Sequence, residues 1–297
     1  MTPESPNNRT NVRFMKWAVQ LAEVVAPDWV ADRAFALWGR PLRLEGRWGA
    51  VGEKARAFAL DTGTVERAAW EWNAGGAAGT ALLVHGWSGN ASQLRAFVDP
   101  LVARGFHVVA VDLPAHGRTA GNFATLPMMA DTVASLARRL TPKLVVAHSL
   151  GATATAYALT HGLQVERLVL LAPPVEMPPY LRHFASQVGL STRAQDKMIS
   201  KVEAIIGKPI DELDLRRHAP GWAAVKALIV HDADDVVTPH AAGAQLAARW
   251  PGARFFETKG HGHDGIRKAR EVVDEAVAFA VGAVLRPAVS ATATRAA

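Results

Sequence analysis

The chain contains no cysteine among its 297 residues. This absence excludes disulfide bonds, thiolate metal sites and a cysteine nucleophile. Long apolar runs are also missing: residues 1–10 are mostly polar, and the stretch Trp17–Ala26 is interrupted by Gln20 and Glu23. A signal peptide or a membrane-spanning helix needs a longer uninterrupted apolar segment. We therefore expect a cytoplasmic protein with no stable membrane insertion.

Clusters of like charge are absent as well. The 33 basic and 27 acidic residues, which give a formal net charge of +6, are scattered along the chain. A nucleic-acid-binding surface gathers lysine and arginine on one stripe or helix, so nucleic acid is not an expected partner. Hydrophobic residues make up 49% of the chain, which is enough for a sizeable core. Nothing in this composition indicates an oligomeric state.

Short apolar runs alternate with helix-length segments through most of the chain. Strands that are covered by helices on both faces are almost continuously apolar, as the first five of the six runs are here. The runs are Ala81–His85, His107–Asp112, Leu144–His148, Leu168–Ala172, Ala227–His231 and Arg254–Glu257, and helices are expected at residues 93–104, 127–140, 150–161, 241–250 and 264–285. This rhythm predicts an α/β fold with a doubly wound, mostly parallel sheet, preceded by strands at Ala57–Leu60 and Ala68–Trp72.

One interval breaks this alternation. Between Pro174 and Trp222 there is no strand-like run, and the apolar residues are spaced as they are in helices. We expect a small helical cap at about residues 175–222, inserted before the strand Ala227–His231. A pair of ordinary crossover helices is the alternative, although the insertion is long for one crossover.

The N-terminal region predicts an amphipathic helix, with Phe14, Trp17, Leu21 and Val25 on one face. We expect this face to pack on the helix's own domain, and contact with a membrane surface or a partner is the alternative. The predicted organisation is an N-terminal helical extension (1–53), a main α/β domain that includes the cap (54–286) and a flexible tail (287–297).

A serine lies where one buried strand meets the next helix. Ser149 follows the apolar run Leu144–His148 and is flanked at two positions on each side by the small residues Ala147 and Gly151. A tight strand-to-helix turn lifts such a hydroxyl off the end of a sheet, and small neighbours let two backbones approach closely. The alternative is a serine that only caps the helix, since serine is a favoured N-cap residue.

Acidic residues and histidines follow the last two runs. The first loop contains Asp232, Asp234 and Asp235, and the second contains His261 and His263. A serine nucleophile needs a base to take its proton and an acid to orient that base, and in sheets of this type the order along the chain is serine, acid, histidine. The sequence has this order, with Glu176 as a fourth candidate for the acid. A zinc site built from the two histidines and Asp264 is a competing hypothesis that leaves the serine turn unexplained.

Taken together, these motifs resemble the α/β-hydrolase superfamily, and within it the bacterial hydrolases of the esterase and lipase type. The resemblance covers about Ala81 to Val281. It rests on His85-Gly86-Trp87, on residues 112–119 (Asp-Leu-Pro-Ala-His-Gly-Arg-Thr), on the serine turn, and on the acidic and histidine loops. It implies an α/β-hydrolase fold with no cofactor and no metal.

The resemblance also assigns roles. By the family pattern, Ser149 is the nucleophile, Asp235 the acid and His263 the base, with Asp234 the second choice for the acid and His261 for the base. The backbone N–H groups of Trp87 and Leu150 would form the oxyanion hole. The pattern has glycine where this chain has Asp232, which puts the conformation of the acidic loop in question because aspartate adopts left-handed backbone less readily than glycine.

A serine at the turn argues against dehalogenases and epoxide hydrolases, relatives that have aspartate there. We expect a small-molecule carboxylic ester with a small-to-medium, apolar acyl chain. His85, His148, His261 and Met177 are candidate pocket residues. Thioester cleavage, perhydrolase, hydroxynitrile lyase or carbon–carbon hydrolase activity would use the same residues, and a ligand-binding protein with an idle site is a further alternative.

Overall fold

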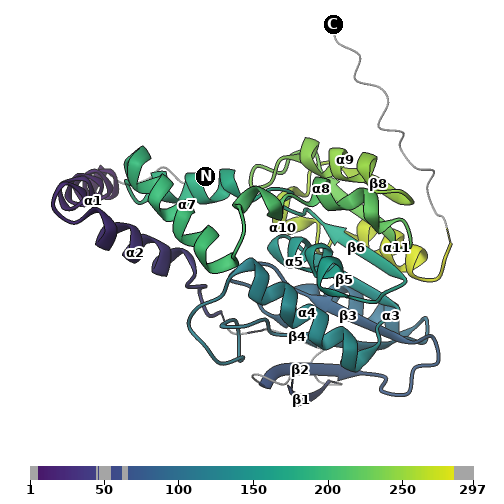
Figure 1. The fold of residues 1–297 in the computed structure, drawn as a ribbon. Helices are drawn as coiled ribbons and strands as arrows, with labels where there is room; N and C mark the ends of the chain where they lie inside the picture. The colour runs from purple at the N-terminus through teal and green to yellow at the C-terminus, as the bar shows by residue number, and fades with distance from the viewer. Residues whose placement is uncertain (1–5, 45, 47–54, 62–65, 284–297) are drawn as a thin grey trace, which may run out of the picture. The chain divides into compact units, whose positions relative to one another are not determined.

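Eight strands form one sheet in the order β1-β2-β4-β3-β5-β6-β7-β8. The computed structural model describes residues 6–44, 46, 55–61 and 66–283 (Figure 1). The strands are β1 (Arg56–Asp61), β2 (Glu66–Trp72), β3 (Thr80–Val84), β4 (His107–Val111), β5 (Leu144–His148), β6 (Arg167–Leu171), β7 (Lys226–Asp232) and β8 (Ala253–Thr258). This arrangement confirms the predicted fold class, and every predicted strand is present.

Strands β3 to β8 run parallel, whereas β2 is antiparallel to both β1 and β4. The strand order reverses around β3, because β4 lies on one side of it and β5 on the other. Connections that leave a sheet in opposite directions open a crevice at the carboxyl ends of the strands, where ligands bind in open α/β sheets. The topology therefore puts a candidate site at the carboxyl ends of β3 and β5.

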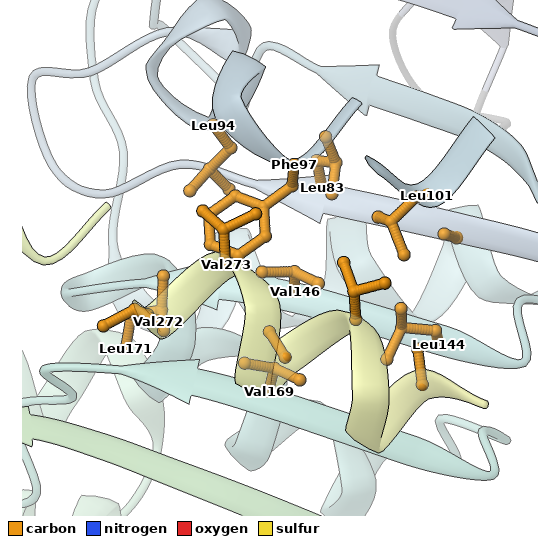
Figure 2. Close-up of a cluster of buried hydrophobic side chains, with 14 of the residues drawn as sticks. Leu83, Leu94, Phe97, Leu101, Leu144, Val146, Val169, Leu171, Val272 and Val273 are labelled. Carbon is orange, nitrogen blue, oxygen red and sulfur yellow. The ribbon is translucent and has the colours of Figure 1, made fainter. Parts of the chain in front are cut away.

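Both faces of the central strands are buried, which explains their nearly continuous apolar sequence. All five residues of β5 are buried. On one face, the side chains of Leu83, Val146 and Val169 meet residues of the 3-10 helix η2 (Ala91–Phe97) and of the helix α11 (Arg270–Ala280) (Figure 2). Phe97 and Val272 belong to this cluster and are also buried.

The other helices of the unit that contains the sheet are α3 (Val98–Val102), α4 (Leu126–Leu140), α5 (Leu150–Ala158), α8 (Leu215–His218), α9 (His240–Arg249) and α10 (Gly262–Gly265), with the short 3-10 helices η3 (Leu159–His161) and η5 (Ala219–Trp222). Two helix predictions were wrong in detail. Residues 93–104 form η2 and α3, with a break at Leu94. The helix predicted from residue 264 is divided between α10 and α11, because Ala269 adopts an extended conformation and Ile266 turns into the core.

Residues 6–40 and 176–214 form a separate helical unit. It contains α1 (Pro6–Val25), α2 (Pro27–Trp38), α6 (Pro178–Gln187), α7 (Thr192–Ile206) and the 3-10 helix η4 (Ile210–Leu213). The inserted helices predicted before the strand Ala227–His231 are thus present. Buried side chains of α2 (Val30, Ala31, Ala34) and of α7 (Ala194, Met198) form its interior.

Two ion pairs tie α2 to α7. Asp28 pairs with Lys197, and Asp32 pairs with Lys201 at 2.5 Å. The sequence did not predict α2, and it did not predict that the N-terminal helices share a unit with the insertion. On α1, Trp17 and Leu21 remain 56% and 54% exposed, so packing covers only part of the predicted apolar face. The predicted limits at residue 53 and over the tail 287–297 lie outside the described residues.

No helix within the residues that the structure describes is both long enough and apolar enough to cross a membrane.

Candidate active site

Ser149 occupies the turn between β5 and α5 with a positive φ of 52° and a ψ of −133°. A residue other than glycine adopts such angles only when its surroundings impose them, at a cost of about 1–3 kcal/mol. Its N–H donates to the carbonyl oxygen of Leu171 at 2.8 Å, and its own carbonyl accepts from Ala152 at 2.8 Å. The Ser149 side chain makes no capping bond to the helix. The hydroxyl is therefore available for another partner.

The small residues around this turn are needed for space. A Cβ atom on Gly151 would overlap the carbonyl oxygen of His85. A Cβ atom on Gly86 would lie 2.9 Å from the Cβ of Ser149 and 3.2 Å from the carbonyl oxygen of His148. The loop after β3 and the turn after β5 thus touch backbone to backbone. The predicted close approach is confirmed at Gly151.

His263 meets both the serine and an acid. Its Nε2 lies 2.9 Å from the Ser149 Oγ, and its Nδ1 lies 2.8 Å from the Asp235 Oδ2. A carboxylate only accepts hydrogen bonds, so Nδ1 carries the proton and Nε2 presents a lone pair to the hydroxyl. The structure therefore brings the three predicted residues together, each from a loop at the carboxyl end of a different strand. This arrangement allows proton transfer from Ser149 to His263.

The side chain of Asp235 is fully buried and is held by several donors. Its Oδ1 accepts from the N–H groups of Val237 at 2.8 Å and of Thr238 at 2.9 Å, and its Oδ2 accepts from the Thr238 hydroxyl at 2.7 Å. Burial alone would raise the pKa of Asp235, but hydrogen bonds from His231, His263 and Thr238 outweigh it and hold the pKa far below its usual range. Asp235 is thus a fixed anion beside the imidazole.

Two further residues support the acid, and neither is among the residues predicted from the sequence. His231, at the end of β7, is fully buried, and its Nε2 lies 3.0 Å from the Thr238 Oγ1 and 3.4 Å from the Asp235 Oδ2. The Thr238 hydroxyl also lies 3.2 Å from the His263 Nδ1. A histidine and a threonine near an acid carry no distinctive sequence signal, because both are common at the ends of strands and in turns.

Asp232 does not act as the acid but joins two loops. Its buried carboxylate accepts from the N–H groups of His261 at 3.1 Å and Gly262 at 3.0 Å, and from the Thr258 hydroxyl at 2.8 Å. It also accepts from the N–H of Asp234 at 3.1 Å. Its backbone is not left-handed, which answers the question raised by the missing glycine.

The pKa of Asp232 follows from these contacts. Burial favours a higher value, but the hydrogen bonds from Thr258 and from the backbone of Gly262 and His261 outweigh it and lower the pKa.

The two other candidates for the acid do not contact His263 in this way. Asp234 is exposed, and Glu176 belongs to the helical unit.

The predicted pocket histidines His261 and His85 form hydrogen bonds to other groups of the protein. His261 directs its Nε2 to Glu271 at 3.0 Å, so its ring is turned toward α11. His85 is fully buried, donating from Nδ1 to the carbonyl of Gly86 at 2.7 Å and accepting at Nε2 from the N–H of Leu113 at 3.0 Å. Burial, and then the neighbouring His116, lower the pKa of His85 to about 3. Because both ring nitrogens are occupied, His85 fixes the surrounding loops and offers no nitrogen to a ligand.

The two other predicted pocket residues, His148 and Met177, belong to different units of the structure. His148 is buried beside His263, with its Nε2 2.9 Å from the carbonyl oxygen of His263. Met177 is buried at the start of α6, in the helical unit. A place for His261 or Met177 in a substrate pocket stays a prediction.

The two predicted oxyanion donors come from different loops, one next to the serine in sequence and one brought near it by the fold. Leu150 is the first residue of α5, and Trp87 follows Gly86, which closely approaches Ser149. Within the described part of the chain, neither backbone N–H has a main-chain hydrogen-bond partner. Unpaired N–H groups at a helix N-terminus attract negative charge. This geometry is compatible with an oxyanion hole, and the assignment stays a prediction.

The side chains considered for zinc are each committed to other groups. His263 contacts Ser149 and Asp235, and Asp264 pairs with Arg267 at 2.5 Å. No group of three potential metal-binding side chains gathers among the residues that the structure describes.

A mostly parallel sheet with Ser149, Asp235 and His263 on the loops after β5, β7 and β8 defines the class of the α/β hydrolases. A family profile described as the Alpha/beta hydrolase family matches residues 81–275. The chain belongs to the alpha/beta hydrolase family.

Solved structures of known proteins share the fold. Est1E from Butyrivibrio proteoclasticus, a structure with bound ferulic acid, is 15% identical with a TM-score of 0.63, over 76% of this chain and 98% of that one. An esterase from Pyrococcus furiosus is 18% identical with a TM-score of 0.61, over 81% of this chain and 97% of that one. A serine hydrolase from Cycloclasticus zankles is 16% identical with a TM-score of 0.58, over 77% of this chain and 98% of that one. At such identities the likeness is one of fold.

One curated relative matches over a short stretch. The dihydrolipoyllysine-residue acetyltransferase component of the acetoin cleaving system of Cupriavidus necator is 36% identical over 105 residues. The match spans 34% of this chain and 28% of that protein, so the chain covers less than a third of the relative's length.

Proposed function

We propose that the protein is a serine-dependent hydrolase that cleaves carboxylic esters through an acyl-serine intermediate. The observation that carries this proposal is the continuous chain of contacts from the Ser149 hydroxyl to the His263 imidazole at 2.9 Å and on to the Asp235 carboxylate at 2.8 Å. Membership of the hydrolase family and the esterases among its structural neighbours support it.

In this mechanism, His263 Nε2 takes the hydroxyl proton as Ser149 Oγ attacks the ester carbonyl carbon. The N–H groups of Trp87 and Leu150 stabilise the negative charge that develops on the carbonyl oxygen. Collapse of the intermediate expels the alcohol, which receives the proton from His263. Water, deprotonated by the same imidazole, then attacks the acyl-serine and releases the acid.

Asp235 has an electrostatic part in both halves of the reaction. It stays ionised near neutral pH because its pKa is far below its usual range. It accepts the hydrogen bond from Nδ1 of His263, which fixes the tautomer that leaves Nε2 free, and it stabilises the imidazolium that forms. For the substrate we propose a small-to-medium, apolar acyl chain.

A fluorophosphonate probe tests the proposal, because it phosphonylates an activated serine. Wild type should be labelled, Ser149→Ala should not, and Ser135→Ala, a change outside the site, should be labelled like wild type. Rates on p-nitrophenyl esters of increasing chain length, measured beside acyl-CoA thioesters, then define the substrate. A folded wild type that takes no label would overturn the proposal in favour of an idle ligand-binding site, and faster thioester than ester cleavage would overturn the substrate class.

A further inference from the structure

His148 directly precedes the nucleophile in the chain and contacts the base. It is the last residue of β5 and directly precedes Ser149, and it is 3% exposed. Its imidazole ring lies 4.9 Å from that of His263, tilted by 50°. Its Nε2 is 2.9 Å from the main-chain carbonyl oxygen of His263, a contact across 115 positions of sequence. His148 therefore bonds to the backbone of the base and leaves the ring nitrogens of His263 to Ser149 and Asp235.

The hydrogen bond fixes the proton on His148. A carbonyl oxygen only accepts, so Nε2 must carry the hydrogen. Nδ1 is then a lone pair, and this buried atom has no hydrogen-bond partner among the described residues. Burial, and then the proximity of His263 and Arg267, hold the pKa of His148 well below its ordinary value. The ring is thus a neutral donor, and it does not repel His263 when that residue takes up a proton.

The carbonyl of His263 needs such a donor. It belongs to α10, a single turn that ends at Gly265, so the chain does not continue as a helix that could satisfy it. On the amide side, the same loop is held by the buried Asp232 carboxylate, which accepts from His261 and Gly262. His148 and Asp232 thus hold the base loop from two sides, and the His148 bond falls on the base itself.

We propose that His148 is a positioning residue, which sets the place of the His263 imidazole by holding its main-chain carbonyl, and that it does not contact the substrate. The inference rests on the proposed function, since positioning is measured through the reaction. Because His148 and Ser149 are consecutive, nucleophile and base are joined twice: hydroxyl to imidazole, and imidazole to carbonyl. A displacement of about 1 Å between reacting groups costs up to about 10²-fold in rate.

Three substitutions of His148 distinguish the loss of the hydrogen bond to His263 from changes in side-chain volume and in polarity. His148→Gln places an amide N–H at nearly the reach of Nε2, His148→Asn is polar but too short, and His148→Leu keeps volume without a donor. We expect His148→Leu and His148→Asn to lower kcat about 10- to 100-fold, with KM within about twofold of wild type. His148→Gln should stay within about threefold of the wild-type kcat.

A second readout is independent of the ester. Phosphonylation of Ser149 by a small fluorophosphonate needs the base but little of the acyl pocket, so its rate should fall in parallel with kcat. The loss should be the same for every ester in a chain-length series. His161→Leu, a change at a partly exposed histidine bonded to Asp131, is the matched control and should behave like wild type.

These measurements separate the possible failures. A wild type without label or turnover overturns the proposed function itself. An active wild type with unchanged His148→Leu and His148→Asn overturns the positioning role, and so does a change confined to KM that varies with the ester. If His148→Leu does not fold, the ratio of His148→Gln to His148→Asn decides, and equal losses in the two folded variants contradict the proposal.

One measurement needs no variant. The ¹⁵N shifts of His148 in the wild-type protein, followed from mildly acidic to mildly basic pH, should report a neutral ring protonated on Nε2 throughout. A ring protonated on Nδ1, or one that titrates in this range, would overturn the inference.

Discussion

The serine turn and the base loop reach their positions in different ways. The consecutive residues 147–151 determine the turn: a buried strand end, a Ser149 with positive φ and a glycine at Gly151 that lets two backbones touch. The base loop also contains two glycines with positive φ, Gly260 and Gly262, but the groups that anchor it are not local. It is held by the side chains of Asp232 and His148, which come from the ends of two different strands.

This difference has an energetic meaning. The turn is fixed by excluded volume and backbone angles, so damage to it acts through packing. The loop is fixed by hydrogen bonds to buried groups, so damage to it leaves polar atoms without partners, which costs about 1–3 kcal/mol for each group. Substitutions in the two regions should therefore fail in distinguishable ways.

The largest effect is expected at the base itself. His263→Ala should lower kcat at least about 10³-fold, because the group that takes the Ser149 proton is lost. Ester hydrolysis by purified variants measures this loss. His261→Ala should retain far more activity, since its ring is turned toward Glu271. An inactive His261→Ala beside an active His263→Ala would show that the base is wrongly assigned.

A smaller loss is expected at the acid. Asp235→Ala removes the acceptor that holds the His263 tautomer but leaves serine and base in place. Its kcat should exceed that of His263→Ala by roughly 10- to 100-fold. The comparison needs both variants on one ester at one pH. If Asp235→Ala matched wild type, the bond at Nδ1 would have no part in the reaction.

Adding one methyl group at Gly151 tests whether close packing fixes the serine turn. In Gly151→Ala, the new Cβ overlaps the carbonyl of His85, so the loop after β3 must move. We expect a loss of about 1–3 kcal/mol in the free energy of unfolding, together with reduced kcat. Urea denaturation and ester hydrolysis measure the two. Gly75→Ala is the control, because a Cβ atom at that position would have no other atom within 4 Å; equal behaviour of the two variants would contradict the packing argument.

The base loop is tested by pH. The pKa of Asp232 is lowered in the folded protein, so its ionised form contributes stability that is fully present above the unfolded value of about 3.9 and is lost as pH falls through the folded pKa. Asp232→Asn should reduce the free energy of unfolding at neutral pH and flatten its decline in acid. Urea denaturation at a series of pH values, from neutral into the acid range, measures both. Asp274→Asn, at an exposed position, should keep the wild-type slope.

Much of the fold could be predicted because its signals are local. The five central strands are buried on both faces and are therefore apolar at nearly every position, as β5 illustrates. The serine turn was recognisable for the same reason, since strand, serine and small residues are adjacent. The choice of Asp235 and His263 rests on a family pattern, and in the structure the His263 Nδ1 lies 2.8 Å from the Asp235 Oδ2.

What escaped prediction depends on contacts between distant residues. The role of Asp232 as the anchor of the base loop could not be predicted, because its partners His261 and Gly262 lie about 30 positions away along the chain. The pocket role predicted for His85 is wrong because backbone groups occupy both of its ring nitrogens, and no local sequence pattern indicates those contacts. The helix α2 was missed, since its buried residues are small and its partner α7 lies far along the chain.

The pairing of α2 with α7 also has a consequence for the timing of synthesis. Roughly 150 residues separate the end of α2 from the start of α7. At a rate of synthesis of ~5–20 residues per second, α2 is therefore complete about 8–30 s before α7 begins to be made. During that interval Val30, Ala31 and Ala34 have no α7 to cover them, and Asp28 and Asp32 have no lysines to pair with. The rate at which the ribosome delivers a distant segment, and not the speed of helix formation, therefore limits when this unit can assemble.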